Sequence, residues 1–368
     1  MNSLGFNKNN ANTKVIVAMS GGVDSSVAAV LLKQEGYDVT GITLRLYNQV
    51  DSKNAKSCCA GKDIEDAKKV AKQFNFPHLV MNYQDKFFSE VIDDFVESYS
   101  SGETPIPCVK CNQTVKFKHL LNFTKNLKAD TLVTGHYIRR VGGQKNAKMY
   151  KAKDKKKDQS YFLFATTKDQ LDFLRFPIGE YYKSEIREIA DKHSLVVKDK
   201  PDSQDICFVT NNSYRTLIEK LKPESFVKGN ILNVNGEIIG KHDGIVNYTI
   251  GQRKGIGIGG NENPLYVIKI DKKNNIIILG EKKHLEKTTI RLKDINWFAD
   301  NINVNSHIRC SARIRSNQEE SPGTLKIMGN KGIYTFDKKV ASTSPGQACV
   351  FYSIDNGNKV LGGGWINK

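Results

Sequence analysis

The sequence predicts an α/β N-terminal domain with a doubly wound parallel sheet, followed by a small, mostly β central domain and a C-terminal β-barrel. Strand and helix patterns alternate over about the first two hundred residues. After about residue 210, short alternating strands with Gly or Asn-Gly turns dominate. Because 368 residues are also too many for one compact core, we expect three domains, over residues 1–211, 212–285 and 286–368.

The alternation starts with a short β-branched strand, Lys14–Met19, which leads into an apolar-periodic helix, Ser26–Gly36, that ends in glycine. Further strands are predicted over Asp38–Leu46, Pro77–Tyr83 and Ala129–Thr134, and further helices over Asp63–Asn75, Lys86–Tyr99, Gln113–Lys128 and Lys183–His193. Such alternation predicts a parallel sheet with helices on both faces. We expect its binding crevice at the carboxyl ends of the strands.

The rest of the chain is expected to be all-β. The runs Gly229–Val234 and Glu237–Ile239, separated by the turn Asn235-Gly236, illustrate the pattern. From Thr288 to the end the chain is again strand-rich. A division near residue 285 would separate a small linker domain from a barrel.

The formal net charge of +17 is large enough to suggest a polyanionic partner, and nucleic acid before a membrane. An alternative explanation for the positive charge is that an AT-rich genome has raised the number of Lys and Asn codons. The sequence contains no run of about eighteen apolar residues, so it predicts no membrane span. The polar start of the chain lacks the apolar stretch of a secretory signal, so a cytoplasmic location is expected.

A glycine- and serine-rich loop, Ser20–Ser26, joins the first strand to the first helix. Gly21 and Gly22 let the backbone turn tightly and approach an anion, and the amides at the helix start add to a phosphate cradle. Asp24 could hold a Mg²⁺ ion that bridges phosphate oxygens. The alternative is an ordinary capped turn. A P-loop kinase or GTPase is excluded because Gly-x-x-x-x-Gly-Lys is absent.

A second glycine-rich stretch, Gly255–Gly260, formally fits a dinucleotide fingerprint. It does not lead from a strand into a helix, as the physics of that fingerprint requires. With Arg253 and Lys254 beside it, a basic loop near RNA is the better interpretation.

Two of the seven cysteines stand in contexts that favour sulfur chemistry. Cys111 is expected at the very start of the helix running to Lys128, with Asn112 as the N-cap. A helix N-terminus and neighbouring lysines lower a thiol pKa, so Cys111 should be a reactive thiolate. Cys207 lies in a loop after the helix Lys183–His193. Thiolation by thiol exchange requires one cysteine to carry a persulfide and one to release its sulfur.

The loop Ser20–Ser26 resembles the signature of the ATP pyrophosphatases (PP-loop enzymes), which cleave ATP between the α and β phosphates. Seven motifs in one order then narrow the resemblance to the bacterial tRNA-specific 2-thiouridylases along nearly the whole chain. They are the phosphate loop, Cys111–Phe117, Thr134–Tyr137, Asp158–Phe162, Asp202–Cys207, Tyr248–Gly255 and Ser344–Gln347.

The resemblance implies a role for individual residues. Cys111 resembles the nucleophile and Cys207 the persulfide carrier, and a transient Cys111–Cys207 disulfide is implied. Implied ATP-binding residues are Ala18, Met19, Ser20, Gly21, Gly22, Val23, Asp24, Ser25, Leu44 and Gly135. Implied tRNA-binding residues are His136, Lys157, Asp158, Gln159, Arg315 and Gln347, and the target-base region is Ile106, Pro107 and Cys108.

The resemblance also implies the reaction. ATP with Mg²⁺ would adenylate O2 of the wobble uridine in tRNAs for Lys, Glu and Gln, and a persulfide sulfur would then displace AMP. A sulfur-relay protein or cysteine desulfurase would load the sulfur, and no membrane would be involved.

One position departs from the family pattern. Many members have Asp where this chain has Cys108, and a thiol is a poorer base than a carboxylate. Cys108 is either a bystander, a redox partner, or, with Cys111 and Cys207, a ligand of an iron–sulfur cluster.

Two other function classes remain as alternatives. An ATP-dependent amide ligase of the same loop family would need no cysteine pair. A non-catalytic RNA-binding module would keep the nucleotide fold without ATP turnover.

Overall fold

The computed structural model describes residues 1–47, 61–202, 205–209, 214–259, 263–298, 306–341 and 343–368. The chain divides into two compact units. The first holds Met1–Val91, Cys108–Asn211 and Asn358–Leu361; the second holds Ile92–Pro107, Asn212–Gly357 and Gly362–Lys368. Each unit is described by itself.

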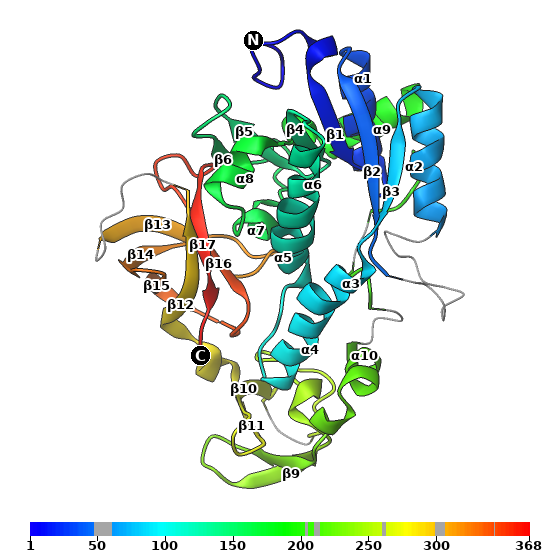
Figure 1. The fold of residues 1–368 in the computed structure, drawn as a ribbon. Helices are drawn as coiled ribbons and strands as arrows, with labels where there is room; N and C mark the ends of the chain where they lie inside the picture. Colours follow the sequence, from blue (N-terminus) through cyan, green and yellow to red (C-terminus); the bar gives the residue numbers. More distant parts are fainter. Residues whose placement is uncertain (48–60, 203–204, 210–213, 260–262, 299–305, 342) are drawn as a thin grey trace. The chain divides into compact units, whose positions relative to one another are not determined.

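The first unit is built on a five-stranded parallel sheet (Figure 1). Its strands are β1 (Lys14–Ala18), β2 (Asp38–Arg45), β3 (His78–Asn82), β4 (Thr131–Thr134) and β7 (Leu174–Arg175), in the spatial order β3-β2-β1-β4-β7. From β1 the chain builds outward through β2 and β3, and then continues on the other side of β1 with β4. The order therefore reverses between β1 and β4, which is where open α/β sheets bind ligands.

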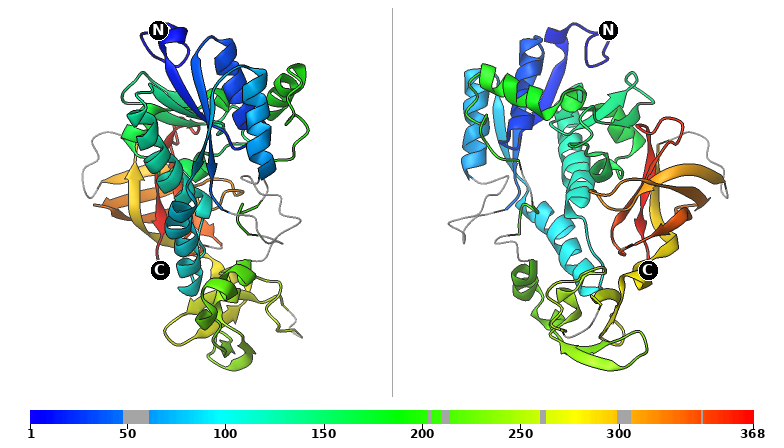
Figure 2. Two further views of the ribbon diagram at one scale, coloured as in Figure 1. Left: turned by 45° about the vertical axis from the view of Figure 1, so that its right-hand side comes forward. Right: turned by 180° about the vertical axis from the view of Figure 1, so that it is seen from behind.

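Helices lie on both faces of this sheet (Figure 2). The helices of this unit are α1 (Val23–Gln34), α2 (Gly61–Gln73), α3 (Gln84–Phe87), α5 (Pro107–Cys111), α6 (Leu121–Asn126), α7 (Ser160–Leu163), α8 (Lys168–Phe173) and α9 (Lys183–Lys192). A small antiparallel pair, β5 (Ile138–Val141) and β6 (Lys148–Lys151), follows β4.

The core under α1, α2 and α9 fixes the start of α1 against β1. Val15 and Val17 of β1 point into this core, and Val27 and Val30 of α1 are fully buried in it. α1 is apolar almost all round, which is typical of a helix that is covered on several sides. Each buried valine of this kind contributes about 1.5–3 kcal/mol of hydrophobic free energy.

The predicted helix Gln113–Lys128 starts earlier than the sequence suggested. Helical structure begins with α5 at Pro107, continues through a π-helical segment, Asn112–Leu120, and ends with α6 at Asn126. Proline suits a first helical position because its φ is preset and it needs no N–H partner there. The prediction that Cys111 opens the helix is therefore wrong, and Cys108 lies in the first turn instead.

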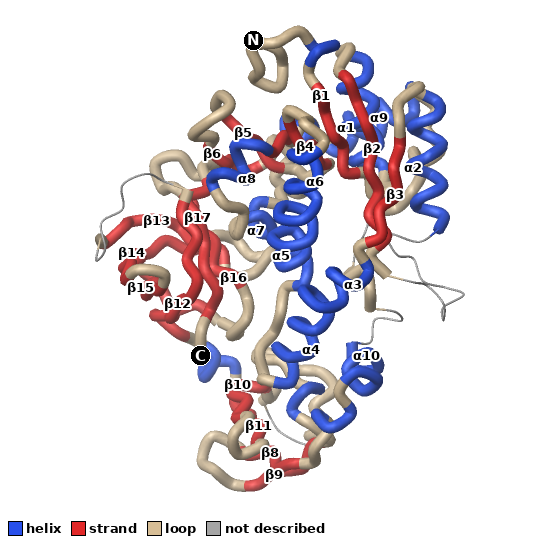
Figure 3. The backbone as a smooth tube through the Cα atoms, viewed as in Figure 1, coloured by secondary structure: helices blue, strands red, loops and turns tan. Residues whose placement is uncertain are grey.

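The second unit is rich in strands (Figure 3). One sheet has the order β10-β11-β8-β9, formed by β8 (Gly229–Leu232), β9 (Ile238–His242), β10 (Tyr266–Asp271) and β11 (Ile276–Gly280). Two helices, α4 (Asp93–Ser100) and α10 (Tyr214–Leu221), belong to the same unit, and Tyr99 stacks on Tyr214 with ring centroids 4.5 Å apart.

A closed six-stranded barrel completes the second unit. Its strands are β12 (Lys287–Trp297), β13 (His307–Arg313), β14 (Ser321–Met328), β15 (Lys331–Val340), β16 (Ala348–Tyr352) and β17 (Val360–Ile366). Tyr334, Phe351 and Cys310 are fully buried in it. The predicted fold class is confirmed in all three parts: the parallel α/β sheet, the small β-rich domain and the terminal barrel. No helix among the described residues is long and apolar enough to cross a membrane.

The packing of the phosphate loop can be tested at Gly21, because this residue combines a positive φ of 76° with a close approach to the backbone of α2. A Cβ at this position would overlap the backbone carbonyl of Asp63 at the start of α2. Gly36 has a similar φ of 86° but open space around it, so Gly36→Ala isolates the cost of the backbone conformation. We expect Gly21→Ala to lower the free energy of unfolding by about 1–3 kcal/mol more than Gly36→Ala.

Urea denaturation of the two variants, followed by ATP-binding titration, checks this expectation. Equal losses of stability in both variants would contradict the close packing of the phosphate loop on α2.

Candidate nucleotide site and cysteine pair

A pocket of about 460 Å³ opens at the carboxyl ends of β1 and β4, where the strand order reverses. The loop after β1 and the turn Gly135–His136 after β4 form its sides. Gly135 permits this approach, since a Cβ there would lie 2.6 Å from the backbone nitrogen of Ser25. Of the residues expected to bind ATP, those that line the pocket are Ala18, Met19, Ser20, Asp24, Ser25, Leu44 and Gly135. Gly21, Gly22 and Val23 complete the loop between them.

Serine hydroxyls hold the phosphate loop in shape. Ser25 Oγ accepts a hydrogen bond from the backbone N–H of Ser20 at 3.1 Å, and it donates to the carbonyl of Gly22 at 3.4 Å. The helix α1 then begins at Val23 with Gly22 as its N-cap. The first N–H groups of a helix have no partner within the helix itself, and together with the positive end of this twelve-residue helix they favour an anion at this point.

Asp24, the residue proposed for Mg²⁺, already has a cation. The ammonium of Lys183 lies 2.7 and 2.8 Å from its two carboxylate oxygens, and the hydroxyl of Tyr137 donates to Oδ1 at 2.6 Å. A carboxylate neutralised on both oxygens does not offer the hard, negatively charged ligand that Mg²⁺ needs. The prediction of a Mg²⁺ ion on Asp24 therefore does not fit this arrangement.

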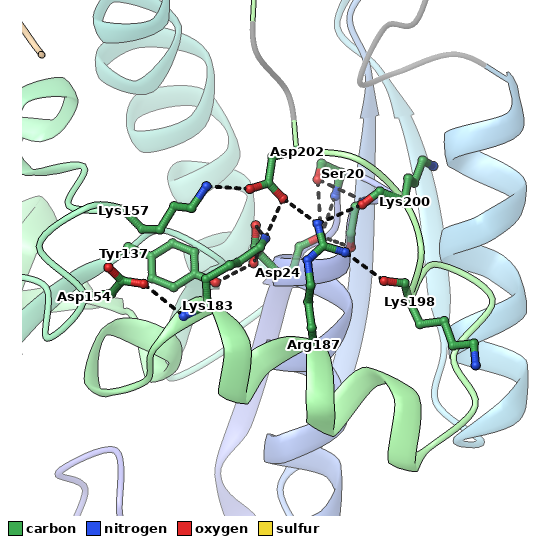
Figure 4. Close-up of polar contacts among 12 residues, drawn as sticks. Ser20, Asp24, Tyr137, Asp154, Lys157, Lys183, Arg187, Lys198, Lys200 and Asp202 are labelled. Atoms are coloured by element: carbon green, nitrogen blue, oxygen red, sulfur yellow. Dashed lines mark hydrogen bonds and ion pairs between the residues drawn. The ribbon is translucent and has the colours of Figure 1, made fainter.

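A second carboxylate, Asp202, lies among three cations at the same pocket (Figure 4). Its Oδ2 is 2.7 Å from the ammonium of Lys157, and its Oδ1 is 2.9 Å from that of Lys183 and 3.0 Å from the guanidinium of Arg187. Burial raises the pKa of Asp202, but hydrogen bonds and charge from Lys157 and Lys183 outweigh it and lower the pKa to about 2. Asp202 is thus ionised at every physiological pH.

Lys200 connects the phosphate loop to α2. Its ammonium donates to the carbonyl of Gly21 at 2.8 Å and to the carboxylates of Asp63 and Asp66 at 2.6 and 2.8 Å. Both carboxylates are nearly fully buried, so pairing with this lysine offsets the cost of burying their charges. The loop and the first turn of α2 are therefore held together by charge as well as by packing.

His136 borders the pocket as a neutral imidazole. Its Nδ1 lies 2.8 Å from the hydroxyl of Thr134, and its ring makes edge contacts with Phe117 and Phe176. Burial, and secondarily the charge of Lys116, lowers its pKa to about 3. A neutral ring can exchange hydrogen bonds with a base or a ribose without adding charge to the pocket.

The two key cysteines belong to the same unit as the pocket. Cys111 is buried, Cys207 is half-buried and Cys108 is exposed, and all three are thiols rather than disulfides. Phe208, next to Cys207, packs edge-on against Phe87 at a centroid distance of 5.6 Å. Cys310 and Cys349 are buried in the barrel, where burial raises the pKa of Cys310 to about 12. Cys58 and Cys59 lie outside the described residues.

The structure does not gather the three soft ligands of the cluster hypothesis. Within the described parts of the chain, no three His, Cys, Asp or Glu side chains are placed so that they could hold a metal ion. Cys108, Cys111 and Cys207 are all described, so the chain as it stands does not fit an iron–sulfur cluster on this trio.

Comparison with known proteins covers the whole chain. Residues 13–211 match the family described as tRNA methyl transferase HUP domain, residues 215–281 its PRC-barrel domain, and residues 287–366 the aminomethyltransferase β-barrel domain. The tRNA-specific 2-thiouridylase MnmA of Parvibaculum lavamentivorans is 47% identical over 373 residues, which cover 100% of this chain and 94% of that protein. Its counterpart in Wolbachia is 52% identical, and the match covers 96% of this chain and 94% of that protein. That of Rickettsia massiliae is 48% identical and covers 99% of each.

This chain belongs to the tRNA-specific 2-thiouridylase family.

Three residues of this family member that were expected to meet tRNA follow β6 in the first unit. Lys157 and Gln159 line the pocket, and Gln159 Oε1 accepts the backbone N–H of Tyr137 at 2.8 Å. Asp158 instead orders the turn before α7: its Oδ2 accepts a hydrogen bond from the hydroxyl of Ser160 at 2.7 Å. Lys157 and Gln159 thus have direct access to a ligand, whereas Asp158 orders the turn between them.

The remaining expected tRNA and target-base residues lie elsewhere. In the second unit, Gln347 Nε2 donates to the carbonyl of Thr104 at 3.0 Å, which ties the barrel to the segment that carries Ile106 and Pro107. Both Ile106 and Pro107 are buried, and Arg315 is half-buried after β13. Asn112, predicted as an N-cap, is buried inside the helix, where its Nδ2 donates to the carbonyl of Phe162 at 3.3 Å. The prediction for Asn112 is therefore wrong, because the helix had already begun at Pro107.

Sequence analysis missed the residues that hold the charges of the pocket. Tyr137 and Asp202 lie inside the motifs Thr134–Tyr137 and Asp202–Cys207, but the pattern alone indicates no role for either. Lys183 and Lys200 gave no signal, since a lysine in a helix or before a loop is usually solvated. Only the fold brings Lys183 from α9 onto Asp24 of α1.

The neutral state of His136 can be tested by following its ring as the pH changes. Its folded pKa of about 3 lies below the ordinary value of 6.5, so between these values only the unfolded chain binds the proton. Its contribution to stability is therefore complete above about pH 6.5 and is lost as the pH falls toward 3. We expect the His136 ring resonances in NMR spectra, assigned with His136→Gln, to stay unshifted between about pH 5 and 8. A titration near pH 6.5 would contradict the enclosed, neutral ring.

Proposed function

We propose that this chain is a tRNA sulfurtransferase that uses ATP to activate the wobble uridine and delivers sulfur from a cysteine persulfide. The observation that carries the proposal is the joint presence, in one unit, of a phosphate-loop pocket and the cysteines Cys111 and Cys207. Full-length relatives named as tRNA-specific 2-thiouridylases support the same activity.

In the first step, O2 of the uridine attacks the α-phosphorus of ATP. The bond between the α-phosphorus and the bridging oxygen breaks, and pyrophosphate leaves with the electron pair. Amides at the start of α1 and the hydroxyls of Ser20 and Ser25 would hold the phosphates, and Lys183 would counter the charge that develops on the leaving group. The target uridine has to leave its base stack to reach the pocket.

In the second step, the outer sulfur of a Cys207 persulfide attacks C2, and AMP leaves with the former O2. The Cys111 thiolate then attacks the Sγ of Cys207. Their new disulfide forms as the old sulfur–sulfur bond breaks, and its electron pair stays on the sulfur now bound to C2. A thiol reductant must reopen the Cys111–Cys207 disulfide before the next turnover.

The tRNA partner fits the charge of the chain. A net charge of +17 would hold the anticodon arm mainly through phosphates. We assign tRNA contacts to His136, Lys157, Asp158, Gln159, Arg315 and Gln347, and the substrate to tRNAs for Lys, Glu and Gln. A persulfide-bearing protein supplies the sulfur, and chemistry that depends on thiols fits a reducing, cytoplasmic setting.

The three domains are proposed to have different roles. We propose boundaries at residues 211 and 285, which agree with matched family segments at 13–211, 215–281 and 287–366. The catalytic groups would then lie in residues 1–211, and the two β-rich domains would serve RNA binding.

Cys207→Ser is the variant that separates the two steps. Because Cys207 is proposed to carry sulfur and not to bind ATP, its loss should abolish thiolation, by at least about a hundredfold, while tRNA-dependent pyrophosphate release persists. Pyrophosphate release and 2-thiouridine formation are measured on the same samples, and Cys310→Ala in the barrel serves as the matched cysteine control. Loss of pyrophosphate release in Cys207→Ser would argue against this division of labour.

The same assay decides the role of Cys108. Thiolation by iron-free protein, kept by Cys108→Ser, supports the persulfide route. Activity that tracks iron content and is lost in Cys108→Ser would restore the cluster hypothesis and overturn the roles given to Cys111 and Cys207.

A further inference from the structure

Lys116 brings a positive charge into the nucleotide pocket from the helical segment that follows Cys111. Its half-buried side chain lines the pocket together with Ser20 and Ser25 of the phosphate loop and with His136. Burial first, and then the charge of Lys116, lowers the pKa of His136, so the ammonium lies near that ring. The pocket therefore receives a cation from the same stretch of chain as the proposed nucleophile.

Asn112, the residue next to Cys111, holds the ammonium of Lys116. Its Oδ1 accepts a hydrogen bond from Lys116 Nζ at 3.1 Å, and its Nδ2 donates to the carbonyl of Phe162 at 3.3 Å. Asn112 is only 4% exposed, so its amide is held by hydrogen bonds at both ends inside the protein. An amide oxygen carries no formal charge, so this contact directs the ammonium without neutralising it.

The shape of the helical segment places Lys116 about one turn after Cys111. Helical structure runs from α5 through the π-helical segment Asn112–Leu120 into α6 (Figure 1). Hydrogen bonds in a π-helix link residues five positions apart, so such residues lie about one turn from each other on one side of the helix. In an α-helix, with about 3.6 residues per turn, residues five apart would point in different directions. The π-helical geometry therefore puts the proposed nucleophile and a cation of the pocket on neighbouring turns.

Two further lysines of the pocket lie against carboxylates. Lys157 pairs with Asp202, and Lys183 pairs with both Asp24 and Asp202. Asp24 stands at the start of α1, so Lys183 belongs to the region where the pyrophosphate part of ATP is proposed to lie. Lys116 comes from the segment after α5 and is therefore available for the other product, the AMP that stays on the uridine until sulfur arrives.

We propose that Lys116 binds the α-phosphate of the adenylated uridine and stabilises AMP as it leaves, and that Asn112 positions the lysine for this role. The inference rests on the adenylation proposed above and adds a catalytic residue to sulfur transfer. In that step the persulfide sulfur bonds to C2, the C2–O2 bond breaks, and its electron pair goes to O2. The phosphate of AMP thereby gains one negative charge, which a nearby ammonium stabilises without giving up a proton.

Two other roles for Lys116 make different predictions. A lysine that only lowers the thiol pKa of Cys111 would be needed near neutral pH but not at high pH, where the thiol ionises unaided. A lysine that only stabilises the helix through Asn112 would affect adenylation and sulfur transfer alike. A lysine on the α-phosphate assists sulfur transfer at every pH.

Binding of the two parts of the nucleotide gives the first test, because it needs no tRNA. The dissociation constants of AMP and of inorganic pyrophosphate are measured by calorimetry for the full-length wild type, Lys116→Met and Lys118→Met. Lys116→Met should bind AMP about tenfold more weakly and should bind pyrophosphate as the wild type does. Lys118→Met removes an exposed lysine of the same helical segment, outside the pocket lining, and should change neither constant.

Single-turnover kinetics with ATP, tRNA and a persulfide donor test the step itself. In Lys116→Met, 2-thiouridine formation should slow about a hundredfold at every pH from about 7 to 9, whereas tRNA-dependent pyrophosphate release should slow less than about tenfold. Lys116→Arg keeps the charge and should recover part of the lost rate. Asn112→Ala should slow 2-thiouridine formation in the wild type but not in Lys116→Met, because Asn112 acts through the lysine.

Equal losses of AMP and pyrophosphate affinity, recovery of Lys116→Met at high pH, or additive effects of Asn112→Ala and Lys116→Met would each overturn the inference. The proposed function fails in a different way. Absence of tRNA-dependent turnover in the wild type, together with a selective loss of AMP affinity in Lys116→Met, would refute the proposed function and leave the phosphate contact of Lys116 standing.

Discussion

The site depends on one electrostatic constraint: the lysine ammonium of Lys183, held almost out of water, has to be shared between two carboxylates. Asp24 and Asp202 lie within 2.9 Å of it, one at the start of α1 and the other ahead of Cys207. This lysine therefore joins the start of α1, where phosphate binding is proposed, to the segment that precedes Cys207, the proposed sulfur carrier. Lys200 repeats the arrangement with Asp63 and Asp66, and it also holds the carbonyl of Gly21. In both cases the burial of charged groups is tolerable because each has a partner of opposite sign.

These ion pairs help to explain how loops and helix ends can hold the groups of the site in place. The phosphate loop is held by the hydroxyls of Ser20 and Ser25 and by Lys200, and the proposed reacting groups come from loops and helix ends. The parallel sheet below, with Val15 and Val17 locked against α1, supplies the rigid base. Strand order then decides the location, since the reversal between β1 and β4 leaves an opening that Gly135 keeps free of side chains. A pocket that already contains its own cations and anions can bind ATP by exchanging partners, at a smaller desolvation cost than an empty one.

Much of this could be predicted from local sequence. The phosphate loop can be predicted because glycines, serines and a strand-to-helix transition occur together at Ser20–Ser26. The order of the domains can be predicted from the change of hydrophobic period near residue 210. Two features could not be read locally. The helix around Cys111 begins at Pro107 because a proline preset for the first turn outweighed the polar residues after Cys111 that looked like a cap. The pairing of Asp24 with Lys183 is the second: the two residues are 159 positions apart, and ion pairs between distant elements leave no periodic trace in a sequence.

The central claim is that the pocket activates the base of the RNA, and not some other acceptor, by attaching AMP to its carbonyl oxygen. An oxygen label tests this most directly. Substrate tRNA carrying ¹⁸O at C2 of the wobble uridine is converted in a single turnover with ATP and a persulfide donor, and the released AMP is analysed by mass spectrometry. Adenylation of O2 predicts that the label appears in the phosphate of AMP, one atom for each 2-thiouridine formed. Unlabelled AMP formed alongside 2-thiouridine would contradict the account, because the oxygen would then have left C2 by another route.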